Sequence, residues 1–185
     1  MIYVIDHEDS FTYNLVHLLE GFGPTYVSNY YDINWRQLEK SKIIIFSPGP
    51  GNPSNYPETQ KVYNKYKGKK KIIGICLGFQ QILYAENAHI VPQKKIYHGY
   101  QSRVKALKES TLFKPNKVFL AGRYHSLKLK EPFNSLSLKI TMRCVESNVA
   151  MAIEDTINNV YGFQFHPDSF LTVDGKFLIQ KVLQF

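Results

Sequence analysis

Short apolar runs, rich in isoleucine and valine, alternate with helical patterns through the first half of the chain. The runs cover Met1 to Ile5, Thr25 to Ser28, Lys42 to Phe46 and Ile72 to Ile75. Their length is that of buried strands, and the helical segments between them supply the crossover connections that parallel strands need. The alternation therefore predicts βαβ units and an α/β fold, with helices on both faces of a parallel sheet.

Apolar spacing predicts the helices between these strands. Gly23 with Pro24 ends the first helix, in which four apolar residues repeat at i, i+3, i+4 and i+7: Leu15, Leu18, Leu19 and Phe22. Pro57 suits the first turn of another helix, whose inward-facing residues are Val62, Tyr63 and Tyr66. A further helical pattern covers Phe79 to Glu86.

After about residue 88 the pattern changes to shorter runs with alternating apolar residues. These runs cover Ser135 to Met142, Val149 to Ile153 and Val160 to Phe165, and they predict antiparallel or mixed strands. Helical spacing returns over Gly175 to Phe185. No internal repeat, low-complexity tract or linker divides the 185 residues, so one domain over 1–185 is expected.

Lysine accounts for most of the basic excess, which gives the chain a formal net charge of +8. One dense cluster stands between a predicted helix and a predicted strand, and a solvated turn explains it: Lys65, Lys67, Lys69, Lys70 and Lys71. No RNP, zinc-finger or helix-turn-helix signature accompanies the lysines. Nucleic acid is therefore not expected as a partner.

No apolar stretch reaches the roughly 18 residues that a membrane span needs, so no membrane partner is expected. The first ten residues already carry Asp6, Glu8 and Asp9 and lack the features of a secretory signal. Two cysteines, Cys76 and Cys144, are too few for a disulfide framework. A cytoplasmic location is the expectation.

The segment Gly74-Ile75-Cys76-Leu77-Gly78 lies where a predicted buried strand gives way to a predicted helix. It is the cysteine version of the nucleophile elbow, G-x-S-x-G. Glycines are needed because the sharp turn leaves no room for neighbouring Cβ atoms. The turn also places the thiol at a helix N-terminus, where the dipole favours the reactive thiolate. The alternative is an inert buried cysteine, a common state of free cysteine.

A nucleophilic cysteine needs a base, and His166 is the candidate among six histidines. It follows the run that ends at Phe165, and Pro167 stiffens the link to Asp168. In that position Asp168 can hold the imidazole while the ring faces Cys76. A surface turn capped by Asp168 is the alternative.

The loop Ser47 to Pro53 contains three prolines and two glycines directly after a predicted parallel strand. Such a rigid backbone can present N–H groups to an oxyanion at the carboxyl edge of the sheet, although a plain tight turn has the same composition. The sequence has no HExxH spacing, no Walker A loop and no G-x-G-x-x-G. No metal and no cofactor are expected.

Taken together, these residues resemble the class I, or triad, glutamine amidotransferases. Within that family the chain is similar to the small subunits of two chorismate-using enzymes, anthranilate synthase and aminodeoxychorismate synthase. The cysteine elbow and the Phe-His-Pro turn are shared by the whole class, and the other segments narrow the resemblance. The matching segments follow in order along almost the whole chain: Asp9-Ser10-Phe11-Thr12-Tyr13-Asn14-Leu15, Ser47-Pro48-Gly49-Pro50-Gly51-Asn52-Pro53, Gly74-Ile75-Cys76-Leu77-Gly78, His98-Gly99, Arg123-Tyr124-His125-Ser126-Leu127 and Gly162-Phe163-Gln164-Phe165-His166-Pro167.

The resemblance implies a flavodoxin-like open mixed sheet with central parallel strands, helices on both faces and a smaller antiparallel strand set. It implies a glutaminase in which Cys76 attacks the side-chain amide of L-glutamine. His166 would act as base and then as acid, Asp168 would orient His166, and the N–H groups of Gly51 and Leu77 would stabilise the oxyanion. The residues implied to hold glutamine and its oxyanion are Gly49, Pro50, Gly51, Leu77, Gln80, Ser126 and Leu127. The ammonia would pass to a large subunit, component I, that aminates chorismate.

Two positions differ from the family pattern. The family usually has glutamate where Asp168 stands, so the contact to His166 must be recovered by a backbone shift or become weaker. It commonly has histidine where Phe79 stands, and because His166 is the base, Phe79 is expected to change packing or partner contact.

Two other hypotheses stay open at this stage. One is a catalytically silent module that keeps the fold and binds a synthase, and the other is a cysteine hydrolase acting on another γ-glutamyl compound.

Overall fold

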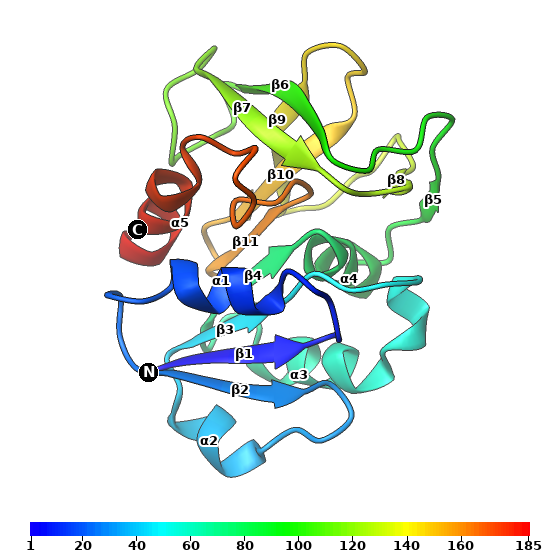
Figure 1. The fold of residues 1–185 in the computed structure, drawn as a ribbon. Coiled ribbons are helices and arrows are strands. Elements are labelled where there is room, and N and C mark those ends of the chain that lie inside the picture. Colours follow the sequence, from blue (N-terminus) through cyan, green and yellow to red (C-terminus); the bar gives the residue numbers. More distant parts are fainter.

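A nine-stranded mixed sheet forms the centre of the structure, a computed structural model that describes residues 1–185 (Figure 1). The strand order is β2-β1-β3-β4-β11-β10-β9-β6-β7. The nine strands are β1 (Ile2–Asp6), β2 (Thr25–Asn29), β3 (Ile43–Phe46), β4 (Lys71–Ile75), β6 (Tyr100–Ala106), β7 (Val118–Arg123), β9 (Lys139–Cys144), β10 (Ala150–Asp155) and β11 (Val160–Phe163). A separate antiparallel pair consists of β5 (Ile90–Pro92) and β8 (Leu127–Leu129).

The sheet has a parallel half and an antiparallel half. Strands β2, β1, β3, β4 and β11 pair in parallel, and from β11 onward each neighbouring pair is antiparallel. The order 2-1-3-4 followed by a fifth parallel strand is that of flavodoxin-like folds. The predicted parallel sheet, and the change to antiparallel strands in the second half of the chain, are confirmed.

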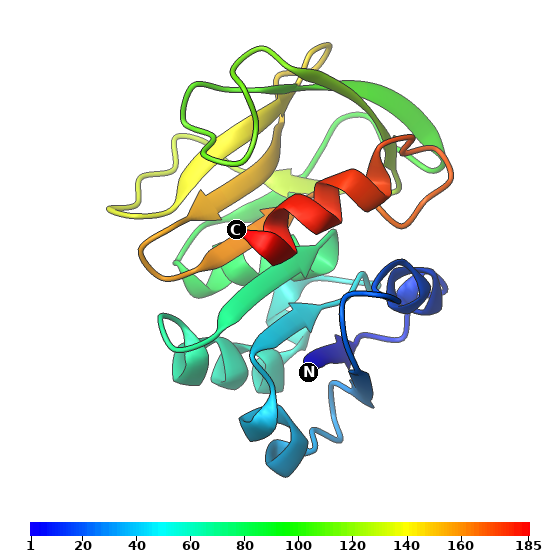
Figure 2. The ribbon, with the colours of Figure 1, turned by 90° about the vertical axis from the view of Figure 1, so that its left-hand side faces the viewer.

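Helices cover both faces of the parallel half (Figure 2). Their bounds are α1 (Thr12–Leu18), α2 (Trp35–Lys40), α3 (Pro57–Tyr66), α4 (Leu77–Ala85) and α5 (Gly175–Gln184), with a short 3-10 turn, η1 (Pro53–Asn55). One apolar core lies between the sheet and helices α1 and α5, and a second lies between the sheet and helices α2, α3 and α4. No helix is both long and apolar enough to cross a membrane.

The predicted apolar residues of the first helix pack on the core, but the helix ends earlier than the sequence pattern indicated. It begins at Thr12 and ends at Leu18, and Phe22 lies beyond it although it still packs on the core. Gly21 and Gly23 adopt φ of 90° and 140°, values outside the helical region, so the chain has already left the helix before Pro24. The predicted helix at Pro57 is confirmed, with Val62, Tyr63 and Tyr66 buried.

The prediction of a strand over Ser135 to Met142 is wrong in its first half, because β9 begins only at Lys139. The Leu138 N–H donates instead to the Ser135 hydroxyl, and the Ser137 hydroxyl donates to Asp155. Such short side-chain bonds compete with strand pairing and hold the segment in a bend.

The last predicted strand is also too long, since β11 ends at Phe163 rather than Phe165. The chain then leaves β4, and the His166 N–H donates to the Gly122 carbonyl at the end of β7. Strands β6 and β7 were not predicted, because many of their residues are polar or exposed and the apolar pattern is weak. Helix α2 was not predicted either.

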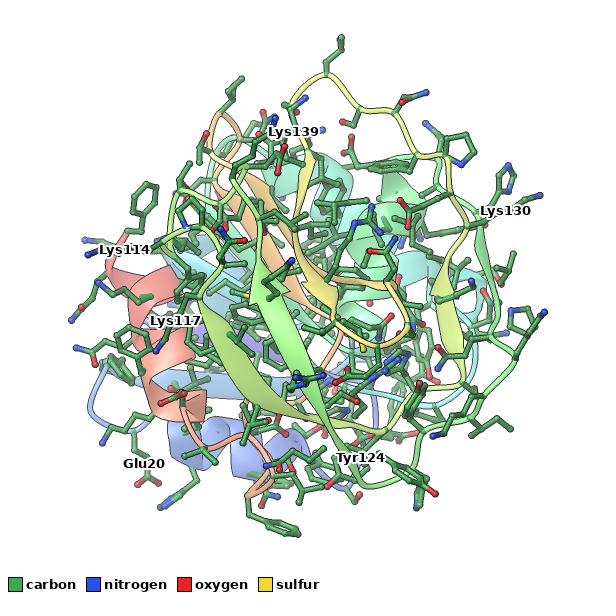
Figure 3. All side chains as sticks on the ribbon, turned by 90° about the horizontal axis from the view of Figure 1, so that it is seen from above. Glu20, Lys114, Lys117, Tyr124, Lys130 and Lys139 are labelled. Atoms are coloured by element: carbon green, nitrogen blue, oxygen red, sulfur yellow. The ribbon has the colours of Figure 1, made fainter.

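The lysine cluster is only in part the solvated turn that was expected. Lys71 is 8% exposed, and its Nζ donates to the carbonyls of Val182 and Leu183 at the end of α5. Burial lowers the pKa of this ammonium group. Lys71 therefore ties the C-terminal helix to the first residue of β4. Four lysines outside this cluster, Lys114, Lys117, Lys130 and Lys139, are exposed and are labelled in Figure 3.

Candidate active site

Cys76 occupies the sharp turn between β4 and α4. Its backbone has φ 53° and ψ −100°, a region that non-glycine residues rarely adopt. A Cβ on Gly74 would lie 2.3 Å from the Gly78 carbonyl oxygen, and one on Gly78 would lie 2.1 Å from the carbonyl oxygen of Phe46. The elbow predicted from the sequence is therefore confirmed, with each glycine required by close backbone contact.

The Cys76 side of α4 opens onto a cavity of about 150 Å³. Of the ten lining residues, seven were expected to hold the substrate and its oxyanion, so the structure brings that whole set together around Cys76: Gly49, Pro50, Gly51, Leu77, Gln80, Ser126 and Leu127. Tyr124 and His125 complete the lining. His166 does not line this cavity, and the larger hollows of the surface lie elsewhere, one of them beside Asp168. A small polar enclosure of this kind suits one small polar molecule.

The loop that follows β3 packs tightly beside the elbow. A Cβ on Gly49 would lie 2.5 Å from the Cβ of His7 and 2.5 Å from a methyl group of Leu77. Gly51 has φ 75°, and the Tyr56 hydroxyl donates to the Pro50 carbonyl at 2.7 Å. The loop is thus held rigidly against the N-terminus of α4, where backbone N–H groups are available to an anion.

His7 was not singled out as a functional residue in the sequence, yet it is fully buried behind this loop. Its Nε2 lies 2.9 Å from the Thr59 hydroxyl and its Nδ1 lies 3.2 Å from the Ser47 carbonyl oxygen. Burial lowers the pKa of His7 to about 3, so the ring is neutral. Its contact with Ser47 supports the loop.

His166 is 2% exposed and packs against a pair of aromatic rings that also contact each other. The ring centroid of Phe11 is 4.9 Å away and that of Tyr124 is 5.0 Å away. Burial favours the neutral imidazole, but the adjoining Cys76 sulfur and the Asp168 carboxylate outweigh it and raise the pKa of His166 to about 10. The ring therefore carries a proton at neutral pH, beside the Cys76 sulfur.

Asp168 contacts His166 at longer range than a tight hydrogen bond. Its Oδ1 lies 3.5 Å from His166 Nδ1, and its side chain is fully buried. Neither carboxylate oxygen has a hydrogen-bond partner, and neither do the two ring nitrogens. The contact is an ion pair that favours the protonated ring without the short geometry of a charge-assisted hydrogen bond. The structure thus brings Cys76, His166 and Asp168 together and gives the shorter aspartate side chain a loose contact.

Gln164 is a site residue that the sequence reasoning missed. It is fully buried, its Nε2 lies 3.9 Å from the Cys76 sulfur, and its Oε1 accepts a hydrogen bond of 3.1 Å from Gln80. The residue lies within the Phe-Gln-Phe-His-Pro segment. Its contact to Cys76 joins the ends of two strands that are far apart in the sequence, so no local sequence pattern predicts it. Phe79 is fully buried against Gly162, so its effect is on packing.

No group of three or more histidine, cysteine, aspartate or glutamate side chains lies close enough together to hold a metal ion.

Comparisons of the sequence with a family model and with known proteins agree on one protein family. The sequence model of the class-I glutamine amidotransferase family matches residues 3–184. "Anthranilate synthase component 2" of Lactococcus lactis is 37% identical over 183 residues, which is 97% of this chain and 92% of that protein. The protein of the same name from Pyropia yezoensis is 38% identical over 192 residues and the whole of both chains.

One solved structure confirms the fold. A Thermoplasma acidophilum protein, assigned as part of a GMP synthase, superposes with a TM-score of 0.84 at 19% identity, covering 99% of this chain and 92% of that one.

Proposed function

Because the chain belongs to the class-I glutamine amidotransferase family, we propose that it is the glutaminase subunit of a chorismate-aminating enzyme, component II of anthranilate synthase. It would hydrolyse L-glutamine to glutamate and ammonia and deliver the ammonia to the large subunit, component I. Relatives that bear the name "Anthranilate synthase component 2" support this assignment, since they match nearly the full chain at 37% and 38% identity.

The observation that carries the proposal is the placement of the buried His166 beside Cys76, at the sharp turn where α4 begins. The Cys76 sulfur and Asp168 raise the pKa of this ring to about 10, and a protonated ring favours a thiolate beside it, the form of cysteine that attacks a carbonyl carbon. A catalytically silent module has no need to keep a buried imidazolium at this position. The same pairing also supplies the acid that a departing amine requires.

The reaction proceeds in two balanced halves. The Cys76 thiolate attacks the side-chain carbonyl carbon of glutamine, and the carbon–nitrogen bond breaks as His166 gives its proton to the departing ammonia, leaving a γ-glutamyl thioester. Water then attacks the thioester, and His166 takes a proton from it. Glutamate leaves, and the thiolate and imidazolium are restored.

Charge that develops on the glutamine oxygen would be held by the backbone N–H groups of Gly51 and Leu77. Leu77 is the first residue of α4, so the positive end of the helix dipole acts at the same point. The rigid packing of Gly49 between His7 and Leu77 supports this role, since it fixes the donors before the substrate arrives.

Labelling with a diazoketone analogue of glutamine tests the proposal against its two alternatives. We expect one adduct, on Cys76, that is lost in Cys76→Ser and prevented by an excess of L-glutamine. Cys144→Ser is the matched control, because Cys144 is also buried but lies on β9 outside the cavity, and a serine hydroxyl can still accept from Arg123, so this variant should label normally.

The other outcomes point away from the proposal. A folded chain, bound to its synthase partner, that takes no label would favour the silent module. Labelling that another γ-glutamyl compound prevents, but L-glutamine does not, would favour a different hydrolase.

A further inference from the structure

A buried arginine at the end of β7 lies behind the glutamine cavity. Arg123 is fully buried and forms no ion pair with a carboxylate. Its Cζ lies 3.4 Å from the ring centroid of Tyr97, so the guanidinium stacks on that ring. Burying a charge without an ionic partner is costly, and other bonds must compensate for it.

The polar contacts of Arg123 go to three neutral groups. Its Nε donates to His125 Nε2 at 3.0 Å, one terminal nitrogen lies 3.4 Å from the Cys144 sulfur, and the other lies 3.5 Å from Gln93 Oε1. The shortest of these is the bond to His125. The guanidinium therefore serves chiefly to orient one histidine ring.

The bond from Arg123 decides which nitrogen of His125 carries the proton. A guanidinium can only donate, so His125 Nε2 must accept, and the proton of the neutral ring is on Nδ1. His125 Nδ1 lies 2.8 Å from the Leu127 carbonyl oxygen and so donates to it. Burial, together with the Arg123 charge, lowers the pKa of His125 to about 3 and keeps the ring neutral.

Gln93 fixes the same short segment from its other side. Its backbone N–H donates to the Ser126 carbonyl at 2.9 Å, and its side-chain amide donates to the His125 carbonyl. The peptide bond between Ser126 and Leu127 is planar and trans, so its N–H points opposite to its carbonyl. Because that carbonyl faces Gln93, the Leu127 N–H points away from Gln93. The carbonyls of three successive residues, His125 to Leu127, are thus all held, and Ser126 and Leu127 are the part of this segment expected to contact glutamine.

We propose that Arg123 is a positioning residue for glutamine binding: it holds His125 as the Nδ1–H form, and His125 with Gln93 fixes the backbone of Ser126 and Leu127 at the substrate cavity. This inference rests on the proposed function. It adds to that function a buried network, none of whose side chains reacts with glutamine.

Steady-state kinetics of glutamate release, in the complex with the synthase large subunit, test the inference. Arg123→Lys keeps the charge but loses the planar fork, and Gln93→Leu removes the amide that donates to the His125 carbonyl, together with its 3.5 Å contact to Arg123. We expect KM for glutamine to rise about tenfold in each, the effect of losing roughly one hydrogen bond, while kcat changes little. Arg143→Lys on β9, an arginine paired with Glu131, is the matched control and should keep both constants.

Two further readouts separate positioning from loss of fold. Alkylation of Cys76 by iodoacetamide needs no glutamine site, so its rate should be unchanged in the variants. In ¹⁵N spectra of the histidine rings, His125 should carry its proton on Nδ1 in the wild type, as the bonds to Arg123 and to the Leu127 carbonyl require.

An active wild-type complex in which both variants keep the wild-type KM would overturn the inference alone. So would a wild-type His125 ring protonated on Nε2. A wild-type complex that releases no glutamate would overturn the proposed function, and the inference with it.

Discussion

The 3.5 Å separation between His166 Nδ1 and Asp168 Oδ1 sets how strongly the carboxylate can orient the ring. At this distance Coulombic attraction persists, whereas the directional part of a hydrogen bond is weak. Phe11 and Tyr124 provide further restraint, since the two rings contact each other and both pack against the His166 ring. Orientation of the base is therefore shared between a loose ion pair and aromatic packing.

Replacing Asp168 should reveal its share of this restraint. We expect Asp168→Ala to lower kcat of the partner-bound glutaminase by about tenfold, or roughly 1.4 kcal/mol, because a loose ion pair orients the ring less than a charge-assisted hydrogen bond would. Asp168→Glu, which adds one methylene, should retain activity. The assay is glutamate release at saturating glutamine, and an unchanged kcat in Asp168→Ala would show that the carboxylate does not orient His166.

The proton on His166 predicts an alkaline limit to activity. Because the Cys76 sulfur and Asp168 raise the pKa of His166 to about 10 against burial, the ring stays protonated through neutral pH and loses its proton as pH rises through about 10. Above that value no acid is left for the departing ammonia, so kcat/KM should fall. The pH dependence of glutamate release checks this, with Asp168→Ala moving the limit to lower pH. An alkaline limit near 6.5, the ordinary value of histidine, would contradict the ion pair.

At the scale of elements, the turn between β4 and α4 depends on the absence of two Cβ atoms. Gly78→Ala would place a methyl group 2.1 Å from the Phe46 carbonyl oxygen, a backbone atom that cannot move without shifting β3. We expect a loss of unfolding free energy of about 2–4 kcal/mol and of glutaminase activity. Gly21→Ala is the control: φ there is 90°, but no atom lies within 4 Å, so only backbone strain of about 1–2 kcal/mol should appear, with kcat unchanged. Denaturant unfolding measures the free energy of unfolding of each variant, and the glutaminase assay measures its kcat. Equal losses in Gly78→Ala and Gly21→Ala would show that the steric contact at Gly78 is not the cause.

The elements that the sequence predicted well are those whose signal is local. Strands β3 and β4 are apolar on both faces, and the proline of α3 stands at its first residue, so both follow from the pattern alone. The ends of β9 and β11 do not. They depend on the Ser135 hydroxyl and on the bond from His166 N–H to the Gly122 carbonyl, which is a contact between distant segments.

At the scale of the whole molecule, the candidate site forms where the parallel and antiparallel halves of the sheet meet. Cys76 follows β4, His166 follows β11, and Ser126 lies between β7 and β8, as Figure 1 allows the reader to trace. Each segment could be recognised in the sequence by its motif. The links among them, such as Gln164 to Cys76 and Arg123 to His125, come from long-range packing and carry no sequence periodicity.

Two buried neutral histidines make the free energy of unfolding depend on pH in the acid range. Burial lowers the pKa of both His7 and His125 to about 3, against an unfolded value of 6.5, so their stabilisation is complete above pH 6.5 and is lost as pH falls toward 3. Near pH 5.5 the two unfolded rings take up almost two protons, which gives a slope of about 2.5 kcal/mol per pH unit. His166 acts oppositely and at higher pH, between 6.5 and about 10.

Denaturant unfolding between pH 5 and 6.5 measures this slope. His7→Gln should reduce it by about half, because one of the two titrating rings is removed. A free energy of unfolding that stays constant over this interval would contradict the neutral buried rings.

The most direct measurement of the central claim is glutamate release from L-glutamine by this chain, alone and with each chorismate-using large subunit, with Cys76→Ser as control. We expect activity that appears with component I of anthranilate synthase and vanishes in Cys76→Ser. Activity only with the large subunit of aminodeoxychorismate synthase would keep the chemistry and change the partner. A folded complex that releases no glutamate with either large subunit would contradict the account and leave the silent module in its place.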